Sequence, residues 1–239
     1  MTAEPIRPLQ QHPRAQRLLR RPAAAWRTPA QRRLLLALGW ALLAALTFAR
    51  IAEDFLTNDP LARWDVEYAR WLAGERTSAG IDAFRIVTFF GGPTVVFVIG
   101  AVVSILLYRR GLRRDAALIP LVLVGAQLLN LVLKFAFHRP RPEVAFVHLE
   151  TYSFPSGHAM MSTALYGTLA FLAWCRIRSR RGQSLLLLAT SAFVAVICFS
   201  RLYLGMHYLS DVLAGAAGGV FWLAVSVALV TRAQAVGRT

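Results

Sequence analysis

Six long apolar runs dominate the sequence, and charged residues separate each run from the next. They span residues 34–49, 86–108, 116–133, 159–175, 182–200 and 212–231. A helix needs about 17–25 predominantly apolar residues to cross a bilayer. Five of the runs reach that length, and the first reaches it only if its flanking arginines extend toward the headgroups. The pattern predicts an all-α integral membrane protein, a six-transmembrane-helix bundle.

Two other interpretations of these runs fit less well. A soluble bundle would have to bury all six runs in a chain of 239 residues, which is too small for six such cores. A cleaved signal peptide does not suit the first run, because the segment before it is 33 residues long and carries eight arginines. We expect an uncleaved first helix after a basic, disordered tail at residues 1–33.

Residues 51–85 lie between the first two runs and carry charges of both signs. Asn58-Asp59-Pro60 is typical of a helix start, with a capping acid and then proline at the first helical position. An apolar set then recurs at helical spacing, with charged residues on the other faces: Leu61, Trp64, Tyr68, Trp71 and Leu72 against Arg63, Asp65, Glu67 and Arg70. The pattern predicts an amphipathic helix that either lies on the outer membrane surface or caps the bundle, and that borders the entrance for a lipid.

Composition and charge support a membrane protein and predict its orientation. The chain is 56% hydrophobic, has a mean hydropathy of +0.49 and carries a net charge of +15. With six spans, the arginine-rich segments all lie on one side and leave the other side nearly neutral: residues 1–33, 109–115, 176–181 and 232–239. The positive-inside rule makes the arginine-rich side cytoplasmic.

We therefore predict a multi-pass protein of a bacterial cytoplasmic (inner) membrane with both termini in the cytoplasm. The membrane domain is expected at residues 34–232, and residues 233–239 form a short cytoplasmic tail. The arginines occur in clusters between apolar runs and not along one polar face, so nucleic acid is not expected as a partner. The expected partners are membrane lipids.

Polar residues follow one face of the third predicted helix. Gln127, Asn130 and Lys134 are three and four residues apart, and polar groups in a membrane helix usually face the bundle interior. Lys134 is the only lysine among the 27 lysines and arginines, and it lies on the nearly neutral side, where topology does not explain it. In the last predicted helix, the spacing of Gly215 and Gly219 favours close helix packing.

Three short motifs on the extracytoplasmic side carry the candidate chemistry. The last contains His207 and Asp211, which lie one helical turn apart, so the carboxylate can fix one imidazole nitrogen and leave the other free to attack. A stabilising contact at a helix start would explain the same spacing without catalysis. Arg201, at the outer end of the fifth run, is either an interfacial anchor or an inward-facing cation, and the inward role is favoured by the lack of positive excess on this side.

The middle motif, Pro155-Ser156-Gly157-His158, comes directly before the fourth run. A helix N-terminus offers free amides and a positive dipole end to an anion, and glycine lets the backbone come close to it. Ser156 can also cap the helix without binding a ligand, and the two roles are compatible.

The first motif joins Lys134 to Arg141 through a proline-rich stretch that cannot stay helical. A rigid loop is expected there, which turns an arginine back over the helix ends. Arg139 and Arg141 are both candidates for that arginine, and their spacing does not separate them.

Together these motifs resemble, position for position, the signature of the type 2 phosphatidic acid phosphatase superfamily. Its members are membrane lipid phosphate phosphatases, and vanadium haloperoxidases are soluble relatives. The resemblance covers roughly residues 120–220 and implies that His207 is the nucleophile of a phosphohistidine mechanism, that Asp211 orients it, and that His158 is the acid and then the base. It places Lys134, Arg141, Ser156, Gly157 and Arg201 around the phosphate, and it favours Arg141 over Arg139 because the family has six intervening residues.

The resemblance implies hydrolysis of a lipid phosphate or diphosphate at the extracytoplasmic face, on phosphatidic acid, phosphatidylglycerol phosphate, a polyprenyl diphosphate such as undecaprenyl diphosphate, or lipid A phosphates. The three cations can stabilise the charge of phosphoryl transfer, so neither a metal nor another cofactor is expected. A phosphotransferase on the same scaffold is the alternative enzyme. A non-catalytic lipid-binding or transport protein is disfavoured by the complete set of His158, His207 and Asp211.

Overall fold

The structure is a computed structural model that describes residues 29–57, 60–147 and 150–236. All regular secondary structure within these ranges is α-helical. The helices are α2 (Pro29–Leu56), α3 (Pro60–Gly74), α4 (Ser78–Phe89), α5 (Pro93–Arg109), α6 (Arg113–Phe137), α7 (Gly157–Trp174), α8 (Arg180–Tyr203) and α9 (Leu209–Val236). The all-α prediction is confirmed for the part of the chain described here.

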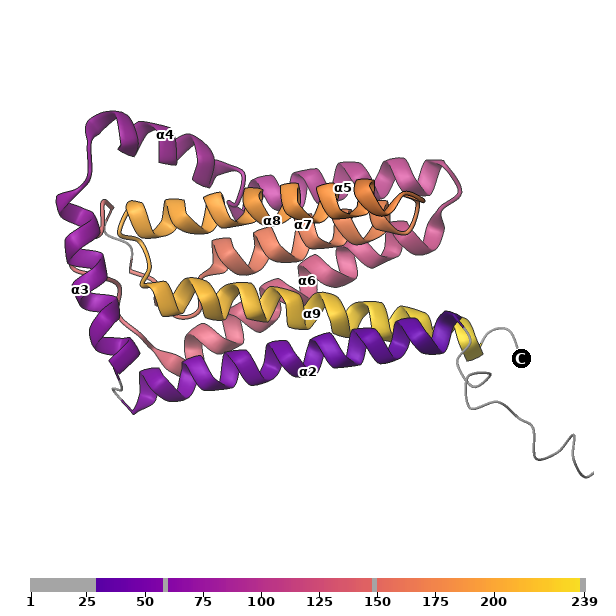
Figure 1. The fold of residues 1–239 in the computed structure, drawn as a ribbon, viewed down its shortest axis with the longest axis horizontal. Coiled ribbons are helices and arrows are strands. Elements are labelled where there is room, and N and C mark those ends of the chain that lie inside the picture. Colours follow the sequence, from indigo (N-terminus) through magenta and orange to yellow (C-terminus); the bar gives the residue numbers. More distant parts are fainter. Residues whose placement is uncertain (1–28, 58–59, 148–149, 237–239) are drawn as a thin grey trace, which may run out of the picture.

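The helices α2, α5, α6, α7, α8 and α9 run along the long axis of the molecule, and α3 crosses one end of them (Figure 1). Helix α7 occupies the centre, where it packs against α5, α6, α8 and α9. Helix α2 lies along α9. The interior is apolar, and residues of α6 and α7 such as Ile119, Met160 and Leu165 are almost completely buried in it.

Helices α7 and α9 approach each other closely at two glycines. A Cβ atom at Gly215 would lie 2.4 Å from the carbonyl oxygen of Ser156, and one at Gly219 would lie 2.6 Å from that of Met160. Neither position leaves room for a side chain, so the packing role predicted for these small residues is confirmed. This contact brings the N-terminus of α7 beside the first turns of α9.

The expected apolar run at 86–108 is not one straight helix. Helix α4 ends at Phe89 and α5 begins at Pro93, with Gly91 and Gly92 in the turn between them. Two glycines followed by proline interrupt a helix, because glycine is flexible and proline suits the first position of a new helix. The sequence contains this helix-breaking pattern, but the hydropathy of residues 86–108 led us to expect one continuous run. Helix α4 therefore turns away from α5 and lies over the end of the bundle that α3 crosses (Figure 1).

Five stretches of the described residues are long and apolar enough to cross a membrane: Ala30–Leu56, Ser78–Arg109, Arg113–Phe137, Arg180–Tyr203 and Leu209–Ala233. The first begins inside the segment expected to be a tail, and residues 1–28 lie outside the described part of the chain. Helix α7, at the position of the fourth predicted span, is not among the five. A multi-pass membrane protein follows from these stretches.

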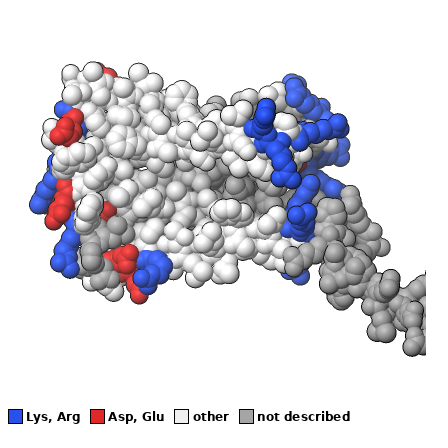
Figure 2. Space-filling model, in the orientation of Figure 1, with Lys and Arg blue, Asp and Glu red and all other residues white. Residues whose placement is uncertain are grey.

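The surface agrees with a membrane belt between two polar ends. Large apolar side chains on the outer faces of the bundle are exposed, including Leu42, Val102, Leu128 and Leu188. Figure 2 shows this wide uncharged band, with lysine and arginine side chains gathered at one end and charges of both signs at the other. Such a belt is suited to lipid and not to water.

Helix α3 forms where the amphipathic pattern predicted it, but one residue of its polar set faces inward. Trp64 and Trp71 are exposed, whereas Ala69 and Leu72 are buried against the bundle. Asp65 lies on the buried face and is only 1% exposed. The expectation that Asp65 belongs to an outward polar face was therefore wrong, because Asp65 forms a buried ion pair with Arg139.

Candidate active site

Three connecting segments meet at the end of the bundle that α3 crosses. They are the loop after α6, the turn before α7 and the short loop between α8 and α9. Backbone hydrogen bonds join them: Ser153 N donates to Arg139 O at 2.8 Å, and Ser156 N donates to Asp211 O at 2.9 Å. All three predicted motifs thus contribute to one region of the molecule.

His207 lies between a carboxylate and a cation. Its Nδ1 is 3.5 Å from Oδ2 of Asp211, and its Nε2 is 3.4 Å from Nη1 of Arg141. The ring is almost fully buried. Because Asp211 faces Nδ1, the arrangement favours the tautomer with its proton on Nδ1 and a free lone pair on Nε2.

The electrostatic surroundings keep this imidazole neutral. The pKa of His207 lies well below its ordinary value of 6.5, first because the ring is buried and then because of the positive charges of Arg201, Arg141 and Lys134. These are the three cations identified in the sequence motifs, and all three act on the same imidazole ring. A neutral imidazole that faces cations is suited to attack an anionic phosphoryl group.

Arg141 is fixed by several hydrogen bonds. Its Nε donates to Thr151 O at 2.9 Å, its Nη2 to Thr151 Oγ1 at 2.8 Å, and its Nη1 to Met206 O at 2.6 Å. Burial lowers the pKa of Arg141, and the negative charge of Asp211 raises it. The guanidinium is therefore held against the α8–α9 loop next to His207.

Asn130 and Lys134 of the polar stripe of α6 contact the segment before α7, and the predicted inward direction is confirmed for Asn130. Asn130 is buried, and its Nδ2 donates to Pro155 O at 3.4 Å. Lys134 is half-buried and its Nζ donates to Tyr152 O. Asn130 also lies against Gly157, because a Cβ atom there would be 3.1 Å from Asn130 Oδ1.

The turn before α7 has the expected form of a helix cap. Ser156 is the N-cap residue, and its Oγ accepts from Ala159 N at 3.5 Å. His158 follows on the first turn, close to the break between α4 and α5: a Cβ atom at Gly91 would be 3.5 Å from its Cδ2, and one at Gly92 would be 3.9 Å from its Nε2. The α4–α5 turn therefore forms one wall beside His158.

Arg201 is 6% exposed and faces inward, not toward the membrane surface. Its Nη1 donates to Thr88 Oγ1 at 2.8 Å, while its buried Nε has no hydrogen-bond partner among the described residues. An unpaired buried guanidinium donor is costly unless a ligand completes it. Sequence reasoning did not identify Thr88, because a lone threonine in an apolar run carries no distinguishing signal.

The two candidate arginines of the first motif have different neighbours. Arg141 contacts His207 at Nε2, whereas Arg139 contacts Asp211, with its Nη1 at 2.7 Å from Oδ1. Arg141 therefore lies against His207, and Arg139 lies against the carboxylate of Asp211.

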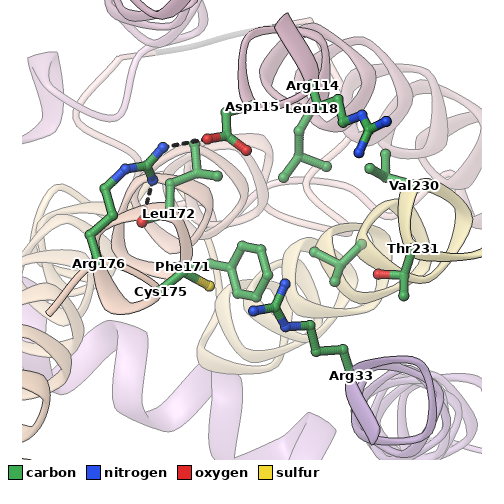
Figure 3. Close-up of a pocket in the computed structure, with 11 residues that line it drawn as sticks. Arg33, Arg114, Asp115, Leu118, Phe171, Leu172, Cys175, Arg176, Val230 and Thr231 are labelled. Atoms are coloured by element: carbon green, nitrogen blue, oxygen red, sulfur yellow. Dashed lines mark hydrogen bonds and ion pairs between the residues drawn. The ribbon is translucent and has the colours of Figure 1, made fainter. Parts of the chain in front are cut away.

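A separate cavity of about 270 Å³ opens at the arginine-rich end of the bundle (Figure 3). Arg33, Arg114 and Arg176 surround it, and Arg176 forms an ion pair with Asp115. None of the residues that line it belongs to the three motifs. The candidate chemistry is at the opposite end.

A known family matches the part of the chain that contains the three motifs. Residues 115–235 match the PAP2 superfamily, a stretch that contains all three motifs and about half of the chain. The chain belongs to the PAP2 superfamily. Asp65 and Thr88 lie outside the matched residues.

Three curated relatives resemble about half of the chain. Phosphatidylglycerophosphatase B of Bacillus subtilis is 34% identical over 123 residues, which are 51% of this chain and 59% of that protein. Lipid phosphate phosphatase gamma of Arabidopsis thaliana is 31% identical over 55% of this chain and 63% of its own length. Sphingosine-1-phosphate phosphatase 2 of Mus musculus is 37% identical over 49% of this chain and 32% of its own length. The chain spans less than two thirds of the length of each.

Two solved structures share the fold of this PAP2 protein. The transmembrane PAP2-type phosphatidylglycerolphosphate phosphatase of Bacillus subtilis matches with a TM-score of 0.68 and 24% identity, over 83% of this chain and 97% of that one. LpxE of Aquifex aeolicus matches with a TM-score of 0.53 and 24% identity, over 68% of this chain and 94% of that one. The helical fold is thus shared with these two solved structures, the first of which is a transmembrane PAP2-type protein.

Proposed function

We propose that the chain is a membrane phosphatase that removes phosphate from a lipid phosphate or lipid diphosphate without a metal ion. One observation carries the proposal: His207 directs Nδ1 toward Asp211 at 3.5 Å and Nε2 toward Arg141 at 3.4 Å. This is the arrangement of an oriented, neutral nucleophile beside a cation. The names of the curated relatives, which are phosphatases of lipid phosphates, support the same substrate class.

In the proposed reaction, Nε2 of His207 bonds to phosphorus while the bond from phosphorus to the lipid oxygen breaks. His158 donates a proton to the departing oxygen. Water then attacks the phosphohistidine, His158 takes a proton from that water, and the phosphorus–nitrogen bond breaks to release inorganic phosphate. The covalent step divides one difficult displacement into two easier ones.

The remaining motif residues stabilise the phosphoryl oxygens in this proposal. Lys134, Arg141 and Arg201 supply positive charge, and Ser156 with the amide of Gly157 supplies donors at the N-terminus of α7. Charge in phosphoryl transfer spreads over the equatorial oxygens, so preorganised cations provide the main stabilisation. Three protein cations can fill the role that a divalent metal has in other phosphatases.

Replacing Arg141 by glutamine is expected to move the acidic limb of kcat/KM to higher pH. His207 must be neutral to attack, so activity rises as the pH increases through its pKa. The positive charge of Arg141 helps to keep that pKa below 6.5, and its loss raises the pKa. Profiles of both proteins on one short-chain lipid phosphate provide the test, because ionisation of the substrate is then common to both.

The exposed Arg85 on α4 offers a matched control, since Arg85→Gln removes the same charge away from His207. Its acidic limb should coincide with that of the wild type. An Arg141→Gln limb at or below the wild-type position would contradict the electrostatic account of His207.

We also propose that α7 spans the membrane in addition to the five candidate stretches, which makes six spans, and that the active site is on the extracytoplasmic side. The arginines at the α5–α6 and α7–α8 turns favour a cytoplasmic location for that end of the bundle. A reporter fused after Thr239 should therefore report the cytoplasm, and a reporter inserted after Gly74 should report the opposite side. The reverse pair of signals would refute this orientation.

The activity is tested with detergent-purified protein, EDTA and a panel of phosphatidic acid, phosphatidylglycerol phosphate, undecaprenyl diphosphate and lipid A 1-phosphate. Release of inorganic phosphate from at least one of them, without an alcohol acceptor, is expected. Phosphate transfer that requires an added acceptor would indicate a phosphotransferase. Absence of turnover on the whole panel, or turnover that depends on magnesium, would contradict the proposed function.

A further inference from the structure

Arg139 lies in a buried network that joins α3 to the start of α9. Its Nη2 donates to Oδ2 of Asp65 at 2.9 Å, and its Nη1 donates to Oδ1 of Asp211 at 2.7 Å. All three side chains are at most 5% exposed. One guanidinium thus bridges two buried carboxylates, one of which faces His207.

Two aromatic rings contact the guanidinium of Arg139. Its Cζ lies 4.2 Å from the ring centroid of Tyr208 and 4.6 Å from that of Phe55. Contacts of this kind favour the cation and restrict its orientation. Arg139 is therefore fixed in position by α2, α3 and α9 together.

The two carboxylates also cap the N-terminus of α9. Oδ2 of Asp211 accepts from Tyr208 N at 2.9 Å, and Oδ1 of Asp65 accepts from Ser210 N at 3.0 Å. Ser210 Oγ also donates to Asp65 Oδ2. The first amides of a helix lack partners within the helix, so Asp65 completes α9 from another helix.

These contacts determine the position of the carboxylate that faces the imidazole. Asp211 is completely buried, and a buried carboxylate without a cation tends to become neutral. Oδ1 is bound to Arg139, and Oδ2, which accepts from Tyr208 N, lies 3.5 Å from Nδ1 of His207. Asp65 in turn limits where Arg139 can lie.

We infer that Asp65 and Arg139 are positioning residues of the reaction, acting through Asp211 on the tautomer and orientation of His207. Asp65 lies on α3, outside the matched family region, so the surface helix contributes to catalysis through one buried carboxylate. The inference rests on the proposed function for its catalytic consequence. The bridge itself is a property of this chain.

A purely structural ion pair would lower only the amount of folded protein when it is broken. A positioning pair lowers turnover in each folded molecule and leaves substrate binding nearly unchanged. Asp65→Asn keeps the shape of the side chain and removes its charge, and Glu67→Gln is the matched control because Glu67 is exposed on the same helix.

The experiment measures kcat and KM per folded site, with sites counted by vanadate binding. Asp65→Asn should lower kcat by roughly 10- to 100-fold with KM within about threefold, as coupled buried groups do. Arg139→Gln should lower kcat further, and adding Asp65→Asn to it should have little additional effect, because both act through one bridge. Glu67→Gln should match the wild type. Asp65→Asn with wild-type kcat per site would overturn the inference.

A second readout does not depend on activity. Nitrogen-15 spectra of histidine-labelled protein report which ring nitrogen of His207 carries the proton, with His207→Gln used to assign its signals. We expect the Nδ1–H form in the wild type and a mixture of tautomers in Asp65→Asn. Identical His207 signals in both proteins would refute the positioning role, whether or not the wild type hydrolyses a lipid phosphate. Failure of the wild type to hydrolyse any tested lipid would refute only the proposed function.

Discussion

Replacement of His207 by alanine is expected to reduce phosphate release by at least about 10⁴-fold, because loss of a covalent nucleophile removes the whole two-step route. No other imidazole among the described residues lies between Asp211 and Arg141, so no neighbouring ring can substitute for it. The loss should appear in kcat, and vanadate should still bind through the cations. The measurement is the initial rate of phosphate release per folded site.

His138→Asn is the matched control for the removal of a histidine. His138 is the C-cap residue of α6 and has a positive φ of 49°, a conformation that asparagine adopts readily. The ring of His138 packs on Tyr152. This variant should remain close to wild-type activity. If His207→Ala kept more than about one tenth of the wild-type rate, a contribution as large as that of a nucleophile would be excluded.

Replacement of Asp211 by asparagine is expected to lower kcat by about 10³- to 10⁴-fold with a smaller change in KM, as the loss of an orienting carboxylate does in other catalytic triads. The asparagine keeps the size of the side chain but cannot pair its charge with Arg139, which lies 2.7 Å away. It can also present an amide N–H to Nδ1 of His207, which favours the wrong tautomer.

Asp82→Asn tests whether the effect is specific to this position. Asp82 is an exposed acid on α4, so its replacement removes the same charge without touching His207. The circular dichroism spectra and vanadate affinities of the two variants should be compared with their kcat values. An Asp211→Asn enzyme with folded helices and near-normal turnover would show that His207 needs no orienting carboxylate.

Sequence reasoning predicted that the three motifs come together, because their spacing is one that a helix start or tight turn preserves. Nδ1 of His207 lies 3.5 Å from Oδ2 of Asp211, although His207 precedes α9, which begins at Leu209, and Ser156 caps α7 where the turn was expected. The inward direction of Asn130 also followed from its polarity in an apolar helix. Local rules sufficed at these positions.

The parts that were missed depend on long-range contacts. Asp65 was assigned to an exposed face because an isolated amphipathic helix places charge outward, yet Arg139 and the first turn of α9 bury it. The different partners of Arg139 and Arg141 could not follow from two arginines separated by one proline. The hydrogen bond between Thr88 and Arg201 depends on the break after α4, where Gly91 and Gly92 let the chain turn, and hydropathy alone does not predict that break.

The account depends most directly on a covalent bond between phosphorus and His207. Wild-type protein should be mixed with a phosphorus-32-labelled short-chain lipid phosphate, stopped in alkaline denaturant, which preserves phosphohistidine, and mapped by peptide mass spectrometry. We predict acid-labile phosphate on the peptide that contains His207, with none trapped in His207→Ala. Hydrolysis without any trapped phosphate on rapid quenching, or phosphate on His158 instead, would contradict the account.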